Sequence, residues 1–391
     1  MSQLLNERWS ETKEALLEGL QGNRRASMNV CLENTRRHLA ESATAGATSA
    51  GNVATLNRVI LPVIRRVMPT VIANEIIGVQ PMTGPVGQIH TLRVRYADSG
   101  DNVTAGEEAL SPFKIAAAYS GNNADATPKA NSTSALEGTP GKRMSIQILK
   151  SPVEAKSRKL SARWTFEAAQ DAQAQQGIDI EAEIMAALAQ EITAEIDQEI
   201  LASLRALASV EETYDQSLVS GTATFVGDEH AALAIQINRV ANLIAQRTRR
   251  GAGNWAVVSN QALTILQSAT TSAFARTTEG TFEAPTNTKF VGTLNGAMRI
   301  YVDAYKSDTD DANQVLIGYK GASEADAAAF YCPYIPLMSS GVVLDPATFE
   351  PVVGFLTRYG YVELSNTASS LGNAADYLGK VAITSANVSF K

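Results

Sequence analysis

The stretch IDIEAEIMAALAQEITAEIDQEILASLRAL, residues 178–207, determines much of the architecture. Its large apolar residues recur every four positions: Ile180, Ile184, Leu188, Ile192, Ile196, Ile200 and Leu204. Each step of four overshoots one helical turn by about 40°, so the apolar stripe winds around the helix. The pattern predicts a spine helix about 43 Å long that has neighbours on more than one side.

Charge is segregated around the start of this helix. Residues 142–163 hold seven lysines or arginines and one acid, whereas residues 164–204 hold nine acids and no lysine or arginine. The two blocks are either solvated faces, or they pair within one chain or across an interface between copies. The candidate inter-subunit contacts in these blocks are Lys142, Arg143, Lys156, Arg158, Lys159, Arg163, Glu181, Glu183, Glu191 and Glu195.

Two alternating segments precede the spine. IHTLRVRY (89–96) and MSIQI (144–148) predict strands, and the weakly hydrophobic residues between them predict a long excursion. Residues 1–41 read as a separate, charged amphipathic peptide, and residues 42–57 are small and polar, as in a linker or an extended arm. This arm region is locally cationic through Arg58, Arg65 and Arg66, which are either solvated or in contact with an acidic partner or nucleic acid.

The part after the spine alternates between helix and strand. A helical pattern covers 228–247, WAVVSN (255–260) starts a strand, and strands return after residue 331. This order indicates an α+β or α/β domain.

Composition and motifs exclude several functions. Hydrophobic residues make up 45% and charged residues 19% of the chain, which indicates a folded protein, and the net charge of −7 excludes a global basic field. The two cysteines and three histidines predict no disulfide framework, metal site or cofactor. GAGNWA (251–256) follows a helix and precedes a strand, the reverse of a dinucleotide fingerprint. No catalytic residue and no membrane span is expected.

RRVMPTVIANEIIGVQPMTGPVGQIHTLRVRY (65–96) resembles the start of the mature major capsid protein of T-even-like tailed bacteriophages, with Gly78 to Gly87 in the family's GVQPMxxPxG pattern. Further matching segments follow in family order: 154–171, 250–260, 290–305, 317–321, 331–337, 345–360 and 378–380. The resemblance implies an α+β, HK97-type capsid fold. Its parts would be a leader (1–41), an N-terminal arm (42–87), an extended E-loop (88–150), a peripheral P domain with the spine helix (151–227), an axial A domain (228–330) and a return to the P domain (331–391).

The implied function is self-assembly as hexamers and pentamers into an icosahedral head shell around double-stranded DNA, which the shell contacts weakly and without sequence preference. Scaffold, portal, vertex and decoration proteins and a maturation protease are the expected partners. The protein would lie in the virion, after assembly in the cytoplasm of the host bacterium. An encapsulin-like compartment protein of the same fold is the alternative, and a cytosolic enzyme is the third class.

The family's proteolytic maturation has a candidate site here. Relatives lose a leader after a hydrophobic-x-Glu triplet, and Leu39, Glu41 and Ser42 fit a cut between Glu41 and Ser42. The interval 97–153 is too short for the large extra domain of T-even relatives, so we expect that domain to be absent. Lysine–asparagine crosslinking, as in some capsids of this fold, is not expected at Lys114, Lys129 or Lys142.

Overall fold

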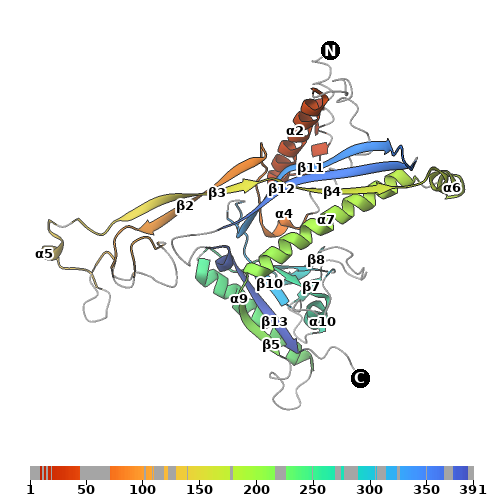
Figure 1. Cartoon of the computed structure of the whole chain (residues 1–391). Coiled ribbons are helices and arrows are strands. Elements are labelled where there is room, and N and C mark those ends of the chain that lie inside the picture. The colour runs from red at the N-terminus through yellow and green to blue at the C-terminus, as the bar shows by residue number, and fades with distance from the viewer. Residues whose placement is uncertain are drawn as a thin grey trace. The chain divides into compact units, whose positions relative to one another are not determined.

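The computed structural model (Figure 1) describes residues 9–10, 13–14, 16–18, 20–44, 71–100, 103–107, 109, 119–121, 129–138, 140–176, 179–215, 226–248, 250–268, 274–276, 289–303, 305, 314–323, 326–348, 350–364 and 373–385. The chain divides into two compact units. Unit 1 comprises 1–87, 152–202 and 330–362, and unit 2 comprises 88–151, 203–329 and 363–391. Each unit combines helices with a β-sheet, which confirms the predicted α+β class.

A four-stranded sheet organises unit 1. Its strands are β1 (Gly78–Val79), β11 (Ala329–Leu344), β12 (Pro351–Glu363) and β4 (Lys156–Arg163), in that order. β1 runs parallel to β11, and β12 runs antiparallel to β4. Every second residue of β12 is buried, namely Val353, Phe355, Thr357 and Tyr359. This period of two shows that one face of the sheet is covered.

The spine is helix α7 (Ile180–Leu207), two residues shorter at its start than the sequence predicts. Figure 1 shows it alongside β4 and β12, after the short helix α6 (Phe166–Gln176). The predicted stripe is buried from Leu188 to Leu204, whereas Ile180 and Ile184 at its start are only partly buried. Asp197 is also buried, and its Oδ1 accepts a hydrogen bond of 2.9 Å from the backbone N–H of Ile72, just before helix α4 (Ala73–Ile76).

The leader differs from the sequence-based picture of a separate segment. Helix α2 spans Gly22–Thr44 and therefore crosses the predicted boundary at residues 41 and 42. Met28, Cys31 and Leu32 of this helix are buried, so it belongs to the core of unit 1. The amphipathic pattern of the leader lies in residues 4–20, before α2, so the sequence predicted neither this helix nor the surface that it meets.

A two-stranded arm covers the predicted E-loop. It consists of β2 (Val86–Tyr96) and β3 (Met144–Glu154), with the short helix α5 (Thr133–Leu136) in the segment that joins them. This pair is hereafter called the hairpin arm. The excursion between the strands contributes to a small core of its own, in which Tyr96, Val103, Ala109 and Tyr119 are buried. The rings of Tyr96 and Tyr119 lie 4.6 Å apart, centroid to centroid.

Unit 2 contains a seven-stranded sheet in the order β5-β13-β10-β6-β9-β8-β7. The strands are β5 (Val210–Asp215), β6 (Trp255–Val258), β7 (Phe274–Arg276), β8 (Lys289–Leu294), β9 (Met298–Val302), β10 (Gln314–Gly318) and β13 (Leu378–Ser385), and a 3-10 turn, η3 (Ala374–Tyr377), precedes β13. Residues Asn295 and Gly296 join β8 to β9 with φ of 53° and 70°, the left-handed pair that a tight hairpin turn requires.

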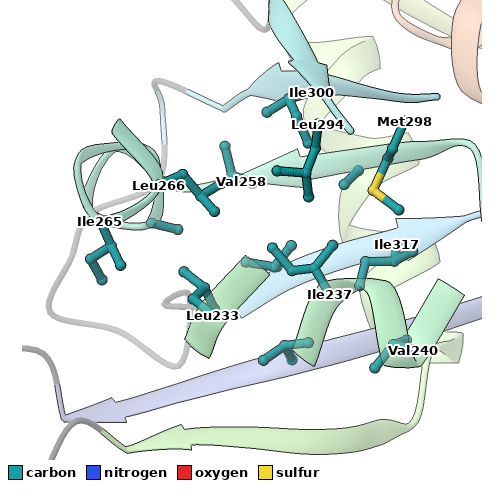
Figure 2. Close-up of a cluster of buried hydrophobic side chains, with 14 of the residues drawn as sticks. Leu233, Ile237, Val240, Val258, Ile265, Leu266, Leu294, Met298, Ile300 and Ile317 are labelled. Carbon is teal, nitrogen blue, oxygen red and sulfur yellow. The ribbon is translucent and has the colours of Figure 1, made fainter. Parts of the chain in front are cut away.

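Two helices, α9 (Val226–Thr248) and α10 (Asn260–Ser268), cover this sheet. Figure 2 shows how Leu233, Ile237 and Val240 of α9 face Val258 and Ile317 of the strands. The spacing of four and three along α9 puts these side chains on one helical face. Gly318 is obligatory here, because a Cβ at this position would come within 2.1 Å of the Trp255 ring.

The domain boundaries differ from the predicted ones at two strands. The prediction assigns residues 151–227 and 331–391 to the P domain, yet β5 and β13 both lie in the sheet of unit 2. They pair in parallel with each other, with Ala382 opposite Thr213. Strand pairing between segments far apart in the sequence depends on the tertiary structure, and no local sequence pattern predicts it. Among the described residues, no helix is long and apolar enough to cross a membrane.

Candidate assembly surfaces

Arg158 connects the sheet of unit 1 to the spine helix. From β4 its Nη1 contacts Glu195 Oε2 at 2.7 Å, its Nη2 pairs with Glu199, and its Nε donates to Tyr359 Oη at 2.6 Å. The Tyr359 hydroxyl in turn donates to Glu199. Glu195 and Glu199 are four residues apart on α7, so they lie on one helical face. One guanidinium thus ties β4, β12 and α7 together.

The network stabilises its charged forms. Burial by itself would raise the pKa of Glu199, but hydrogen bonds from Arg158 and Tyr359 and the positive charge of Arg158 lower it. Burial and the hydrogen bond to Glu199 raise the pKa of Tyr359, so this phenol remains a donor. The network of Arg158, Glu195, Glu199 and Tyr359, hereafter called the clamp, therefore persists at neutral pH.

This arrangement shows intrachain partners for part of the two charge blocks, and their pairing between copies stays a prediction. Arg158 and Glu195 are candidate inter-subunit residues in the sequence, and the structure pairs them within one chain. Arg163 likewise contacts Glu350 of its own chain at 3.8 Å. Sequence reasoning did not single out Glu199 or Tyr359. The spacing of Glu199 from Glu195 was the available signal for the first, and no signal existed for the second.

Two of the candidate basic residues, which lie just before β3, also have partners within the chain. Arg143 Nη2 lies 3.3 Å from Asp98 Oδ1, and the backbone N–H of Arg143 donates to Asp98 Oδ2 at 2.8 Å. The backbone hydrogen bond and then the side-chain hydrogen bond from Arg143 lower the pKa of Asp98. Lys142 lies over the ring of Tyr119, with its Nζ 5.4 Å from the centroid.

The apolar side chains of β3 lack cover. Met144, Ile146 and Ile148 have exposed fractions of 54%, 68% and 59%. They stand at every second position of a strand, so they form one row on one side of the arm. An exposed row of large aliphatic residues on a two-stranded element favours association, because a partner surface would remove the row from water. This row is hereafter called the β3 row.

The other predicted contact residues belong to unit 1. Lys156 and Lys159 on β4 and Glu183 and Glu191 on α7 are exposed, and Glu181 is partly buried in the first turn of α7. Arg58, Arg65 and Arg66 fall outside the described residues, as does Lys114. The inter-subunit roles of these side chains stay predictions.

Leu39, Glu41 and Ser42, the candidate cleavage residues, lie in the last two turns of α2. Further back in this helix, Asn34 Nδ2 donates to the carbonyl oxygens of Met82 at 2.6 Å and Tyr334 at 3.1 Å. Arg24 forms an ion pair with Glu75. The leader is thus attached to unit 1 by polar contacts as well as by its buried apolar side chains.

Two features of the described residues bear on catalysis, namely possible metal ligands and a buried histidine. Within the described ranges, no three His, Cys, Asp or Glu residues group as metal ligands. His230 Nδ1 lies 2.6 Å from Ser268 Oγ at the end of α10, and burial lowers the pKa of this imidazole. Ser268 also donates to the carbonyl of Ile265, so the pair closes a helix end.

Comparison with known proteins supplies the class. The family model described as "Major capsid protein Gp23" matches residues 53–138 and 122–383. The major capsid protein of Vibrio phage KVP40 is 28% identical over 445 aligned positions, which cover 90% of this chain and 85% of that protein. The major capsid protein of Enterobacteria phage T4 is 30% identical over 415 positions, covering 82% and 77% respectively.

Solved capsids show a weaker similarity. The mature capsid of bacteriophage PhiM1 has 13% identity and a TM-score of 0.44, covering 78% of this chain and 83% of that one. The capsid of Myoviridae phage XM1 has 11% identity and a TM-score of 0.41, covering 78% and 89%.

The family match and the relatives together define a structural shell protein of tailed bacteriophages, whose place is the virion capsid. The chain belongs to the Gp23 family of major capsid proteins. It therefore has the HK97-type fold that this family implies, and the comparisons favour the phage capsid over the encapsulin alternative. Its relatives are structural proteins, in line with the expectation of a shell component.

The relatives are longer than this chain. Both alignments run over more positions than the 391 residues of this chain, so each relative has residues without a counterpart here. The two matched ranges of the family model overlap at residues 122–138, between β2 and β3 in the sequence. The absence of the large extra domain of T-even relatives stays a prediction.

Proposed function

We propose that this protein assembles with copies of itself, as hexamers and pentamers, into an icosahedral head shell that encloses double-stranded DNA. Residues 1–41 are the leader that a maturation protease removes after Glu41. The protein acts through its interfaces and has no catalytic step of its own. Scaffold, portal, vertex and decoration proteins are its further partners, and DNA is held weakly.

The β3 row is the observation that carries the proposal. An isolated two-stranded hairpin is at best marginally stable in water, yet this arm exposes Met144, Ile146 and Ile148. A shell of repeated copies covers these exposed side chains, because the hairpin arm of one copy packs on a different surface of the next copy. Such heterologous contacts are what closed assemblies use.

Charge supports the same role. Exposed acids of α7, such as Glu191, and exposed lysines of β4, such as Lys156 and Lys159, are available to steer copies into register. With a net charge of −7 the shell has no global attraction to nucleic acid. Arg58, Arg65 and Arg66 of the predicted N-terminal arm are the proposed local contacts with a neighbour or with DNA.

Expression of the whole chain, followed by negative-stain microscopy and mass photometry, tests the proposal. We expect closed shells, tubes or hexamer sheets. Ile146→Asp with Ile148→Asp should leave a folded subunit that does not assemble, because a charge cannot enter an apolar contact. Gln147→Asp, on the other side of the same strand, is the matched control and should still assemble. Full assembly of the double variant would refute the role of the β3 row.

A further inference from the structure

Helix α2 is anchored to segments distant in the sequence. The amide of Asn34 binds two backbone carbonyls, those of Met82 and Tyr334, which lie 48 and 300 positions away. Met28, Cys31 and Leu32 are each no more than 1% exposed. Near its start the helix is held by the Arg24–Glu75 ion pair. All of these contacts are made within unit 1.

The helix has little stability apart from this docking. GNRRASMNVCLENTRRHLAESAT contains no acid in its first turn and no basic residue in its last turn, so the helix dipole lacks compensation at both ends. In folded proteins most of the stability of a helix comes from tertiary packing of its apolar face. Undocking of α2 should therefore also unwind it.

The candidate scissile bond lies within this docked element. α2 continues to Thr44, so the peptide between Glu41 and Ser42 has helical backbone with hydrogen-bonded neighbours. Proteases cut exposed, irregular chain in preference, and cutting within regular structure requires local opening. When opening and closing are fast, the cleavage rate follows the population of the open state.

We propose that docking of α2 on unit 1 shields the Glu41–Ser42 bond, so that removal of the leader requires α2 to leave unit 1 first. The anchor residues Asn34, Arg24 and Glu75 set the fraction of time in which the bond is accessible. The inference rests on the leader processing included in the proposed function, and it adds that the leader regulates its own removal.

A glutamate-specific endoprotease applied to the full chain tests the shielding. Intact mass identifies the fragment that starts at Ser42, and the cut after Glu137, which is exposed in the segment between β2 and β3, is an internal reference. Asn34→Ala should raise the rate at Glu41 about tenfold, the effect of losing roughly one net hydrogen bond. Arg37→Ala, at an exposed position of the same helix, should not change it.

Variants that exchange the charges of Arg24 and Glu75 separate loss of the ion pair from misfolding of the chain. Arg24→Glu places two acids together and should raise the rate at Glu41 several-fold, whereas Arg24→Glu combined with Glu75→Arg should return it towards the native rate. Equal rates in all variants, or a native rate that matches a synthetic peptide of residues 30–50, would overturn the proposal.

Cys31 provides an independent measure of undocking. Its side chain is fully buried and burial raises the pKa of its thiol to about 12, so alkylation by iodoacetamide requires α2 to open. Labelling of Cys31 should accelerate in the same variants that accelerate cleavage. Faster cleavage with an unchanged labelling rate would contradict undocking. Shell formation is scored separately by microscopy, so failure of the shielding leaves the assembly proposal intact.

Discussion

The sheet of unit 2 and the hairpin arm use the same residue types to opposite ends. Ile317, in the central part of the seven-stranded sheet, is fully buried under α9 (Figure 2), whereas Ile146 of β3 is 68% exposed. Both are β-branched residues in strands, and only the number of covering elements differs. A sheet with seven strands and two helices buries its apolar face within one chain, and a pair of strands cannot.

The difference separates residues that stabilise the folded subunit from residues that stabilise the assembly. Residues of the unit 2 core contribute to the free energy of unfolding of a single subunit. Residues of the β3 row contribute little until another copy covers them, and then they contribute to the free energy of association. Matched substitutions in the two regions can separate these contributions.

Ile317→Ala should have the largest effect on the subunit. Removing three carbons from a fully buried side chain leaves a cavity, and such changes cost about 2–5 kcal/mol of the free energy of unfolding. Chemical denaturation of dispersed subunits measures this loss. A loss below about 1 kcal/mol would mean that the sheet relaxes around the gap and that the core is less tightly packed than the burial suggests.

Arg158→Met should cost about 1 kcal/mol, because the guanidinium and both carboxylates are partly exposed and screened by solvent. The pKa of Glu199 is lowered in the folded chain, so its contribution is present above the ordinary glutamate range and declines as the pH falls through the folded pKa. The difference between native and variant protein should be constant from pH 7 to about 5 and shrink below about 4.

Denaturation series across this pH range provide the measurement. Arg163→Met is the control, because its ion pair with Glu350 is longer and its side chain is 70% exposed. A difference for Arg158→Met that grows on acidification would contradict the ion-pair network.

Tyr119→Phe should disturb the hairpin arm alone. It removes the hydroxyl that donates to the carbonyl of Arg143 at 2.6 Å and accepts from the N–H of Asp98 at 3.3 Å. We expect amide hydrogen exchange at residues 96–98 and 143 to accelerate about fivefold, while exchange in the unit 2 sheet is unchanged. Faster exchange in both regions would show that the arm's small core and the sheet unfold together.

Ile146→Ala should have the smallest effect on the dispersed subunit, less than about 0.5 kcal/mol. The same substitution should weaken assembly, seen as a higher subunit concentration at which shells appear in light scattering. If the subunit loses as much stability as with Ile317→Ala, the β3 row is covered by its own chain and the comparison fails.

Much of the local structure was predictable. The repeat of four from Ile180 to Leu204 predicted α7 to within two residues, and alternation predicted β2 and β3. The resemblance around Gly78 to Gly87 predicted the family, which the comparisons confirm. These features depend on residues near each other in the chain, where periodicity and local motifs carry the information.

The clamp and the leader anchor were not predictable. Charge segregation suggested that residues 142–163 and 164–204 meet, but the choice of Arg158 and its pairing with Glu199 depend on strand register and helix rotation. The two carbonyls that bind Asn34 belong to segments that come together only in the folded unit. A backbone carbonyl has no sequence signature at all.

By itself, the sequence determined the spine helix, the strands of the arm, the charge blocks and the capsid family, because each is written in nearby residues. Tertiary structure alone decided that β5 and β13 pair in unit 2, that Arg158 closes a clamp within its own chain, and that α2 docks on unit 1. The physical reason is that register, pairing partner and burial depend on which distant surfaces exclude water together.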